Sequence, residues 1–360
     1  GGHTISNLSI SRYDYSGLFG YIGTGGTIQN VGVVNGTVAG GYFVGMVAGQ
    51  NEGTITNVYS TGTVSGSKYV GGLVGFDANT ISRSYSLAAV TAPFYAGGLV
   101  GQENGTISQS YAGGSVSGQQ FVGGLVGLSG ASATISDAYA SGAVTGTSPG
   151  TNVGGLVGYN FGTITRTYAT GAVTGSSAVG GLVGYNNGSI ANSFWDTTTT
   201  GLSQGYGSNS GTFNAAGLTT AQLQDLSSYS STYTGWDFQN VWAPPNQVGQ
   251  NNGATVAHYP ELYAFLTVLT IAPNAVTRNY GDTNPALTAT YYGNLRPGDS
   301  FASLASLFTS AGQFSNVGDY AITASGASVT SPSGNAYRLV YIPGTLTVNE
   351  ADLPGRTVLE

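Results

Sequence analysis

An exact eight-residue repeat constrains the fold of this chain more than any other feature. The stretch VGGLVGYN occurs at residues 153–160 and again at residues 179–186. Its leucine recurs at intervals of 26, 26, 31 and 26 residues, at Leu73, Leu99, Leu125, Leu156 and Leu182. Met46 and Leu18 hold the equivalent place in two earlier, imperfect copies. A fixed period of this length is typical of a chain built from stacked, equivalent units.

Three other positions follow the same period. A Thr/Ser-Ile pair places isoleucines at Ile28, Ile55, Ile81, Ile107, Ile135, Ile164 and Ile190; an aromatic series follows at Tyr59, Tyr85, Tyr111, Tyr139, Tyr168 and Phe194; and a valine follows at Val64, Val90, Val116, Val144 and Val173. Short apolar runs separated by Gly or Asn indicate short strands and corners, because each Gly inside a helix costs about 1 kcal/mol. We therefore predict an all-β fold, with a parallel β-solenoid of 26-residue turns over residues 1–200.

Stacking turns each repeat position into a column along the solenoid, with neighbouring turns about 4.8 Å apart. The Leu, Ile and Val columns are expected to form the core. Asn51, Asn160 and Asn186 are expected at a corner, in left-handed geometry and with laddered side-chain amides. The glycines would provide corners of positive φ and allow neighbouring turns to approach closely. They therefore need no ligand.

The GGLVGYN-x-G-x-I pattern resembles the GLUG motif, a repeat of large bacterial surface and secreted proteins. Those proteins include filamentous-haemagglutinin-like adhesins and some sequences described as related to IgA peptidases. The resemblance covers roughly half of this chain. It implies an adhesin exported by a two-partner or similar route from a Gram-negative organism.

Residues 201–266 are predicted to be a Trp-rich cap and linker that covers the open end of the solenoid. The run 218–226 (LTTAQLQDL) predicts a helix with Thr219 or Thr220 as its N-cap. Trp236 and Trp242 follow. GLUG-repeat proteins commonly finish with a similar sequence, so the resemblance also implies a cap. A carbohydrate-stacking pair of Trp side chains is the alternative.

Residues 267–349 carry alternating strands and turn signals about ten residues apart, which predict a small antiparallel β-sandwich. The YGDTNPALT run, SNVGDYAITASGA and YIPGTLTV resemble the MBG domain, an immunoglobulin-like module of bacterial adhesins. We interpret residues 350–360 as a linker, with Leu359-Glu360 as a tag scar. The start at GGHTISNLSIS shows no signal peptide, and we expect a piece of a larger parent chain.

Charge and composition exclude several classes of function. The formal net charge is −7 with eight Lys and Arg residues, so no basic patch can neutralise nucleic acid or an anionic membrane. No run of 18 apolar residues is present, so we expect no membrane insertion. Cysteine is absent. An isopeptide bond needs a lysine, and Lys68, the sole lysine, lies in the repeat, so such a bond is excluded in the sandwich. His3 and His258 lie in different segments, and no HExxH, GxSxG or Walker motif occurs.

Two groups of acids are candidates for chemistry. Asp77 and Glu103 occupy the corner position of Asn51 and should lie one strand spacing apart. Such a pair can share a proton, bind a cation or act as a glycosidase pair, although a solvated corner is the interpretation that we favour. The sandwich acids Asp282, Asp299 and Asp319 could hold Ca²⁺, with turn capping as the favoured role. Otherwise we expect no cofactor.

An aromatic stripe is the better candidate for a functional surface. Phe43, Tyr69, Tyr95 and Phe121 precede the inward-pointing position of each glycine block at intervals of 26 residues. Strand alternation then places these rings outside, where they would suit sugar faces or a neighbouring chain. Packing under a corner is the alternative. The separate column that begins at Tyr59 is ambiguous, because the residues on either side of each ring are mostly small and either set could face the core; we favour buried rings.

The sequence therefore predicts a non-catalytic fragment of a secreted bacterial surface adhesin, an extended scaffold for cell adhesion or biofilm contact. Its partners would be host or bacterial surfaces, including glycans or exopolysaccharide, and not nucleic acid. We expect a monomer outside the bacterial cell, with a role in virulence. Two alternatives stay open: a glycan-binding module that uses the aromatic stripe, and a polysaccharide-degrading β-helix enzyme that uses Asp77 and Glu103 in a shared groove.

Overall fold

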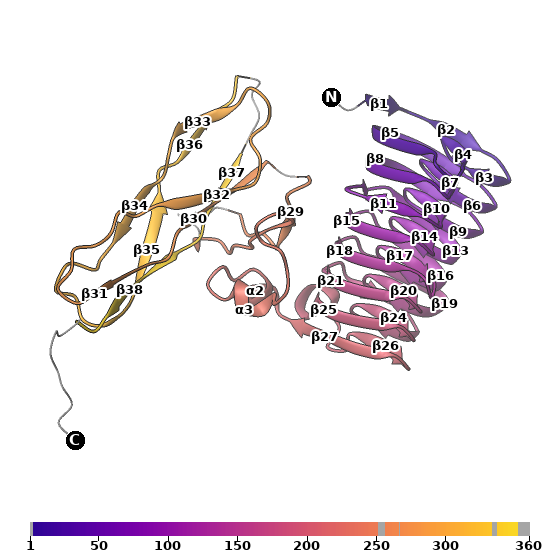
Figure 1. Cartoon of the computed structure of the whole chain (residues 1–360). Helices are drawn as coiled ribbons and strands as arrows, with labels where there is room; N and C mark the ends of the chain where they lie inside the picture. The colour runs from indigo at the N-terminus through magenta and orange to yellow at the C-terminus, as the bar shows by residue number, and fades with distance from the viewer. Residues whose placement is uncertain (1–2, 251–255, 266, 333–336, 352–360) are drawn as a thin grey trace. The chain divides into compact units, whose positions relative to one another are not determined.

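The computed structural model describes residues 3–250, 256–265, 267–332 and 337–351, and it contains two compact units. The first comprises Gly1–Leu223 and Ser230–Trp236, and the second comprises Gln224–Tyr229 and Asp237–Glu360. The segment predicted to be cap and linker is therefore divided between them. Figure 1 shows a stack of strands in the first unit and smaller, separate sheets in the second.

One wall of the first unit is an eight-stranded parallel sheet to which each turn contributes one short strand. These strands are β4 Phe19–Ile22, β7 Ala48–Asn51, β10 Val74–Asp77, β14 Val100–Glu103, β17 Val126–Ser129, β20 Val157–Asn160, β24 Val183–Asn186 and β26 Tyr206–Asn209. Parallel pairing between successive turns makes this unit a β-solenoid, as predicted.

The other strands of the first unit form one continuous nineteen-stranded sheet that bends around the solenoid. They are β1 His3–Ser6, β2 Ser9–Ser11, β3 Asp14–Ser16, β5 Thr27–Ala39, β6 Tyr42–Gly45, β8 Thr54–Ser65, β9 Lys68–Gly71, β11 Thr80–Ser82, β12 Tyr85–Ser86, β13 Ala89–Gly97, β15 Thr106–Ala112, β16 Val116–Gly123, β18 Thr134–Ala140, β19 Val144–Gly154, β21 Thr163–Ala169, β22 Val173–Thr174, β23 Ser177–Gly180, β25 Ser189–Asp196 and β27 Thr212–Leu218. The step of 31 residues from Leu125 to Leu156 contains extra residues at two places: between Ser129 and Thr134, and within β19, whose pairing with β16 shifts register between Gly118 and Gln120.

The columns expected in the core are buried. The five block leucines are fully buried, as are the isoleucines from Ile55 to Ile190, and Val64, Val90, Val116 and Val144 are 1% exposed. In-register pairing brings like residues together, so that Ile81 pairs with Ile55 and Ile107. Each fully buried side chain of this size stabilises the fold by about 1.5–3 kcal/mol.

The glycines of the repeated block act through close approach. A Cβ on Gly98 would lie 2.1 Å from the carbonyl oxygen of Gly124, one turn away. Among the described glycines of the repeat, only Gly25 and Gly62 have positive φ. The expectation of positive-φ glycine corners is therefore wrong. Left-handed geometry is taken instead by larger residues, which the next subsection describes.

The stack continues beyond residue 200, since β26 and β27 extend both walls to Leu218. Trp195 occupies the column position that Ala169 holds one turn earlier, and it is 6% exposed. Its ring fills the space beside Gly181 and Gly217, where an added Cβ would lie within 2.5 Å of it. Trp195 thus fills the core of the final turns, a role that the sequence analysis missed.

The described residues also contain three one-turn helices, α1 Thr197–Thr200, α2 Thr220–Leu223 and α3 Tyr229–Thr232. Helix α2 replaces the longer helix predicted over 218–226. Thr219 is its N-cap, since Gln222 N–H donates to its hydroxyl and the Gln222 side chain accepts from its N–H. The helix ends early because Asp225 accepts from the backbone N–H of Ser227 and forms a turn.

The second unit contains small sheets, with strands β28 Trp242–Ala243, β29 Glu261–Leu262, β30 Val268–Pro273, β31 Val276–Asn279, β32 Ala289–Tyr292, β33 Ser300–Ser303, β34 Ser306–Thr309, β35 Gly318–Ser325, β36 Ser328–Thr330, β37 Arg338–Tyr341 and β38 Gly344–Asn349. Most pairs are antiparallel, but β30 pairs with β37 and β31 with β38 in parallel. The predicted antiparallel sandwich therefore also contains two parallel pairs, in each of which an early strand pairs with one of the last two strands.

Neither Trp236 nor Trp242 is available to stack on a sugar. Trp236 is 7% exposed within the first unit, and Trp242 is fully buried within the second. The carbohydrate-stacking alternative for this pair is therefore wrong. No helix in the described parts of the chain is long and apolar enough to cross a membrane.

Candidate functional site

An aromatic ladder runs along one corner of the solenoid. The structure places Phe43, Tyr69, Tyr95 and Phe121 there with half-buried side chains, and it adds Tyr15 at the N-terminal end. Neighbouring ring centroids are 4.8–5.1 Å apart, and neighbouring planes lie within 23° of parallel. We call these five residues the corner ladder. The signal for Tyr15 was its place before SGLFG, an imperfect copy of the block.

Every residue of the corner ladder has a left-handed backbone, with φ between 50° and 58°. The chain turns sharply at each of these residues, so that Val44, Val70 and Val122 point into the core. Left-handed geometry costs a residue with a side chain about 1–2 kcal/mol. Each stacked pair returns about 0.5–1.5 kcal/mol, which offsets part of this strain. Backbone hydrogen bonds and the buried valines supply the remainder.

The stacking determines which part of each ring meets the solvent. Parallel rings at these centroid distances must overlap, so Phe43, Tyr69 and Tyr95 turn both faces toward their neighbours. Their edges and the tyrosine hydroxyls face outward. A sugar ring that stacks on an aromatic residue needs a free face, and only the end residues Tyr15 and Phe121 lack an aromatic neighbour on one side within this ladder. The geometry therefore argues against a continuous sugar-stacking platform.

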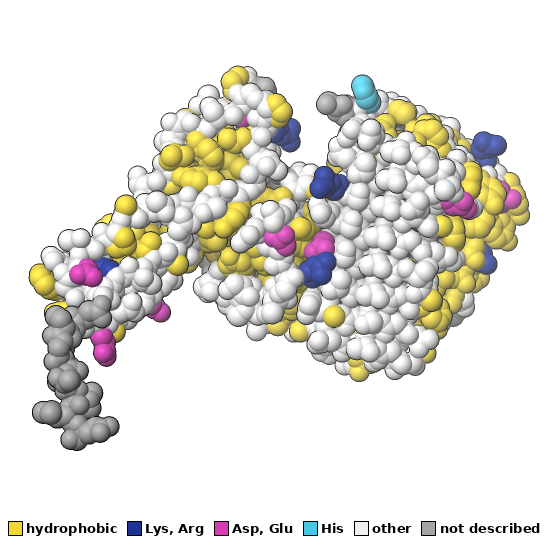
Figure 2. Space-filling model, in the orientation of Figure 1, with side chains coloured by type: hydrophobic (Ala, Val, Ile, Leu, Met, Phe, Trp, Pro, Cys, Tyr) yellow, Lys and Arg dark blue, Asp and Glu magenta, His cyan; other side chains and the backbone are white. Residues whose placement is uncertain are grey.

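Other aromatic side chains widen this corner. Phe76 packs against Phe43 and Tyr159 against Phe121, in edge-to-face arrangements with centroids 6.0 and 5.5 Å apart. Tyr13, Tyr21, Tyr42, Phe94 and Phe161 are exposed. The Lys68 ammonium lies 4.7 Å from the Tyr69 ring centroid. Figure 2 shows hydrophobic side chains gathered along the edge where β3, β6, β9 and β13 lie. The corner is thus an exposed, apolar and rigid surface.

A second ladder, the tyrosine ladder, follows Tyr59, Tyr85, Tyr111, Tyr139 and Tyr168, with ring centroids 4.7–5.1 Å apart. The prediction that this column is buried is wrong for its first four members, which are half-buried on the outer face. The neighbouring small residues, such as Ser60 and Ala112, point inward instead. Tyr168 is 3% exposed, because Trp236 packs against it and Phe194.

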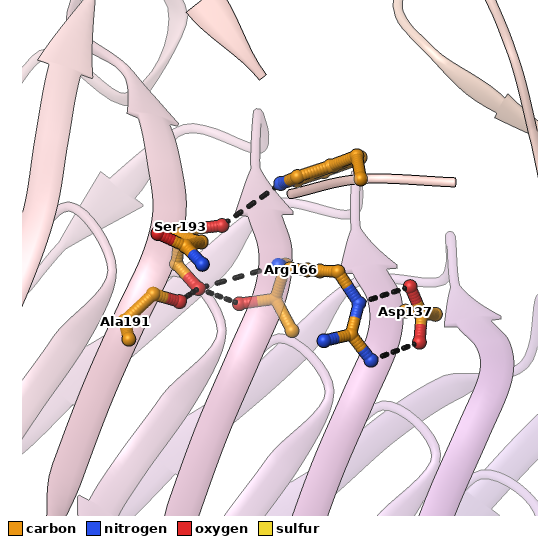
Figure 3. Close-up of polar contacts among 7 residues, drawn as sticks. Asp137, Arg166, Ala191 and Ser193 are labelled. Carbon is orange, nitrogen blue, oxygen red and sulfur yellow. Dashed lines mark hydrogen bonds and ion pairs between the residues drawn. The ribbon is translucent and has the colours of Figure 1, made fainter. Parts of the chain in front are cut away.

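Left-handed residues also precede the tyrosine ladder, at Asn30, Asn57, Arg83, Gln109, Asp137, Arg166 and Asn192. Arg166 donates two hydrogen bonds to Asp137 across one turn, at 2.8 and 2.7 Å (Figure 3). Because the backbone turns sharply at Arg166, the N–H of Thr167 points into the solenoid. There it donates to the buried Ser193 hydroxyl at 3.2 Å. These contacts join neighbouring turns and so maintain the fold. Their polar groups do not gather around one place where a ligand could bind.

The acids Asp77 and Glu103 lie in a buried column together with Asn51, Ser129, Asn160 and Asn186, and the exposed Asn209 ends the column. Both acids are fully buried, so the solvated-corner interpretation is wrong. Their side chains turn inward because the column caps the following turn: Glu103 accepts from Gly105 N–H at 2.6 Å, as Asn51 does from Gly53. The predicted amide ladder exists, but its members do not have the predicted left-handed backbone.

The two acids have unmet hydrogen-bonding capacity in this interior. Asn51 donates to Asp77 Oδ1 at 2.5 Å, whereas Asp77 Oδ2 and Glu103 Oε2 are buried without a donor in the described structure. Burial raises the pKa of Glu103 well above its usual range, and the charge of Asp77 adds to the effect. Burial also raises the pKa of Asp77, against the opposing donation from Asn51. A proton shared between the two carboxyls would satisfy both oxygens, and both side chains are closed off from solvent.

Comparisons with known proteins agree with the two resemblances seen in the sequence. The model of the GLUG motif matches residues 120–145 and 149–174, and the model of the MBG domain (YGX type) matches residues 269–347. The chain carries GLUG motifs followed by an MBG domain. These matches cover the central turns of the solenoid and the sheets of the second unit.

Two individual proteins are similar to parts of the GLUG–MBG chain. Halomucin of Haloquadratum walsbyi is 53% identical over 62 residues, which are 17% of this chain and 1% of Halomucin. A crystal structure from Bacteroides ovatus, provisionally named an immunoglobulin A1 protease, matches with a TM-score of 0.43 and 24% identity, over 73% of this chain and 76% of that one. The match thus spans a very small part of Halomucin, and the structural similarity is too low to carry an argument.

The acids of the MBG domain do not come together. Asp282 accepts from the turn N–H of Asn279 at 3.3 Å, whereas Asp299 and Asp319 accept from the hydroxyls of Tyr337 and Thr347. Turn capping thus describes Asp282. No group of three or more His, Asp or Glu side chains placed to hold a metal occurs in the ranges that the structure describes.

His258 lies in the second unit, where its Nδ1 is 3.2 Å from Glu261. Arg338 also contacts Glu261 and donates to Asn246 Oδ1 at 2.7 Å. These contacts attach residues before the MBG domain to its strand β37. His258 therefore belongs to a packed polar cluster.

Proposed function

We propose that this chain is a non-catalytic segment of a secreted cell-surface adhesin, in which the GLUG solenoid presents a contact surface. The observation that carries the proposal is the exposed aromatic corner. Contiguous apolar surface of this kind is characteristic of interaction sites in soluble proteins. The corner ladder is held rigid by the register of the stack, so binding would cost little side-chain ordering.

The comparisons support a surface location for the parent protein. GLUG and MBG segments occur together here, and the 62-residue similarity is to a protein named as a mucin. The partner would be another cell surface or its matrix. Attraction by opposite charge plays little part, because charged residues make up 6% of the chain.

A non-catalytic role is the simpler account of the acids. Asp77 and Glu103 are fully buried and serve as members of a structural column. The polysaccharide-degrading alternative needs these carboxyls in an open groove with room for a substrate. Their burial gives that alternative no support.

The test is adhesion of beads coated with the full chain to a panel of bacterial and host cells. We expect coated beads to bind at least one cell type and soluble chain to compete. Absence of binding to every cell type and matrix preparation would contradict the proposal. Release of oligosaccharides from a polysaccharide panel would instead support the enzyme.

A further inference from the structure

A regular array of hydroxyl groups covers the outer face of the wall that begins each turn. Five successive turns carry Thr-x-Thr or Thr-x-Ser, with the middle isoleucine buried in the core. The first column is Thr54, Thr80, Thr106, Thr134 and Thr163, and the second is Thr56, Ser82, Ser108, Ser136 and Thr165. We call these ten residues the hydroxyl face.

The register fixes the dimensions of this face. Adjacent turns pair Thr80 with Thr106 and Ser82 with Ser108, without a shift. Hydroxyls therefore repeat about every 4.8 Å along the solenoid and about 6.6 Å along each strand, since a parallel strand rises about 3.3 Å per residue. The insertions between Ile107 and Ile135 and between Ile135 and Ile164 leave the pairing of this face intact.

The chemistry of the face is uniform. Neither column contains a charged or aromatic side chain, whereas the left-handed column beside it contains Arg83, Asp137 and Arg166. Ser82 donates to Thr56 at 3.0 Å, and Thr80 donates to Asn79 at 3.1 Å. In the described parts of the chain the other hydroxyls of the face make no hydrogen bond within the protein, and their side chains are half-buried or, at Thr163, exposed.

Such a surface is poorly suited to a soluble ligand. A neutral hydroxyl contributes only about 0.5–1.5 kcal/mol net, because water competes for every hydrogen bond. Ordering a flexible ligand across many weak contacts would cancel that gain. A solid lattice differs, because its groups are already ordered and all contacts form together. The surface therefore fits a periodic solid with matching repeats.

We propose that the hydroxyl face binds ice. Water oxygens on a prism face of ice also repeat in two directions at spacings of a few ångströms, comparable to those of this array. Threonine hydroxyls can take lattice positions, while the adjacent methyl groups favour ordered water over bulk water. Neither column contains a charged side chain. A charged group would keep its own hydration shell and would disturb the ordered water between the face and the ice. This activity is independent of the aromatic corner.

The experiment measures ice shaping, thermal hysteresis and ice recrystallisation with the full chain. We expect faceted crystals and slowed recrystallisation. The variant Thr106→Lys/Thr134→Lys should abolish both effects, because two ammonium groups would stand in the centre of the array. The matched control is Thr91→Lys/Thr145→Lys, at exposed threonines of β13 and β19 that belong to a single hydroxyl column. The control should retain full activity.

Unfolding monitored by circular dichroism shows whether the variants keep their fold. If the lysine variant does not fold, Thr106→Ala/Thr134→Ala is the variant to test, since it removes the two hydroxyls with little change in volume. It should weaken both ice shaping and the slowing of recrystallisation. Ice crystals that grow unshaped in the full chain would overturn the proposal. Equal loss in the hydroxyl-face variant and in the Thr91→Lys/Thr145→Lys control would also overturn it.

Discussion

In the solenoid, one continuous core runs through all the turns, and each turn supplies the next with paired strands. In the MBG domain, buried residues form small clusters, such as Ile322 with Leu346 and Val348, drawn from distant parts of the segment. The solenoid is thus a chain of near-identical interfaces, while the MBG domain depends on contacts that occur once. The comparison teaches that a local change should have different consequences in the two units.

The largest effect is expected for Gly98→Val. A Cβ added at Gly98 would lie 2.1 Å from the Gly124 carbonyl oxygen, so a branched side chain cannot fit without separating two turns. We expect loss of cooperative unfolding of the solenoid, with the MBG transition retained, measured by calorimetry. Gly312→Ala is the control, because nothing lies within 4 Å of its added Cβ. An unchanged solenoid transition in Gly98→Val would contradict the close-approach role.

Shortening a core side chain should destabilise only the unit that contains it. Leu125→Ala is expected to destabilise the solenoid by about 2–5 kcal/mol, and Ile322→Ala to destabilise the MBG domain by a similar amount. Both side chains are fully buried. Denaturant unfolding followed by hydrogen exchange would show which unit each variant affects. If either variant lowered both transitions equally, the division into two units would be wrong.

The acid column should make solenoid stability fall as pH rises. Burial raises both folded-state pKa values, so the unfolded chain releases its protons first, from about pH 4 upward. The double variant Asp77→Asn/Glu103→Gln should remove this slope and stabilise the solenoid by about 1–3 kcal/mol at mildly alkaline pH. Below about pH 4 the two proteins should converge. Thermal unfolding across pH tests this, and parallel curves at every pH would refute the buried proton.

The smallest effect is expected at the Asp137–Arg166 ion pair. Its side chains are 11% and 30% exposed, so solvent screens the attraction. Asp137→Asn should cost the solenoid about 0–1 kcal/mol, with a smaller cost at high salt. Chemical denaturation at two salt concentrations measures it. A loss as large as that of Leu125→Ala would show that surface columns, and not the core, determine solenoid stability.

The repeat made much of the solenoid predictable from sequence, because its period aligns equivalent residues without any knowledge of contacts. The leucine, isoleucine and valine columns lie where the spacing puts them. The outward position of Phe43 and its equivalents follows from alternation with buried valines. The parallel pairing of β30 with β37 was not predictable, since those strands are far apart in sequence and share no recurring sequence motif that would align them.

The errors arise where alternation is interrupted. A left-handed residue such as Asn57 bends the strand, so Tyr59 points outward although strict alternation from the buried Ile55 would place it inside. Asp77 and Glu103 turn inward because they cap a turn, which composition alone cannot reveal. The aromatic identity of Phe43 and Tyr69 concealed their left-handed backbone, since such geometry usually favours Gly or Asn. These same bends shape the corner and the hydroxyl face.

A comparison of the two ladders shows whether the corner ladder is the contact surface. Tyr69→Ala/Tyr95→Ala removes two neighbouring rings from the corner, and Tyr85→Ala/Tyr111→Ala removes two from the tyrosine ladder. Both variants lose comparable stacking, so stability should fall alike. The measurement is bead adhesion to the cell type that binds the unmodified chain. The account predicts loss of adhesion for Tyr69→Ala/Tyr95→Ala only, and equal adhesion by both variants would contradict it.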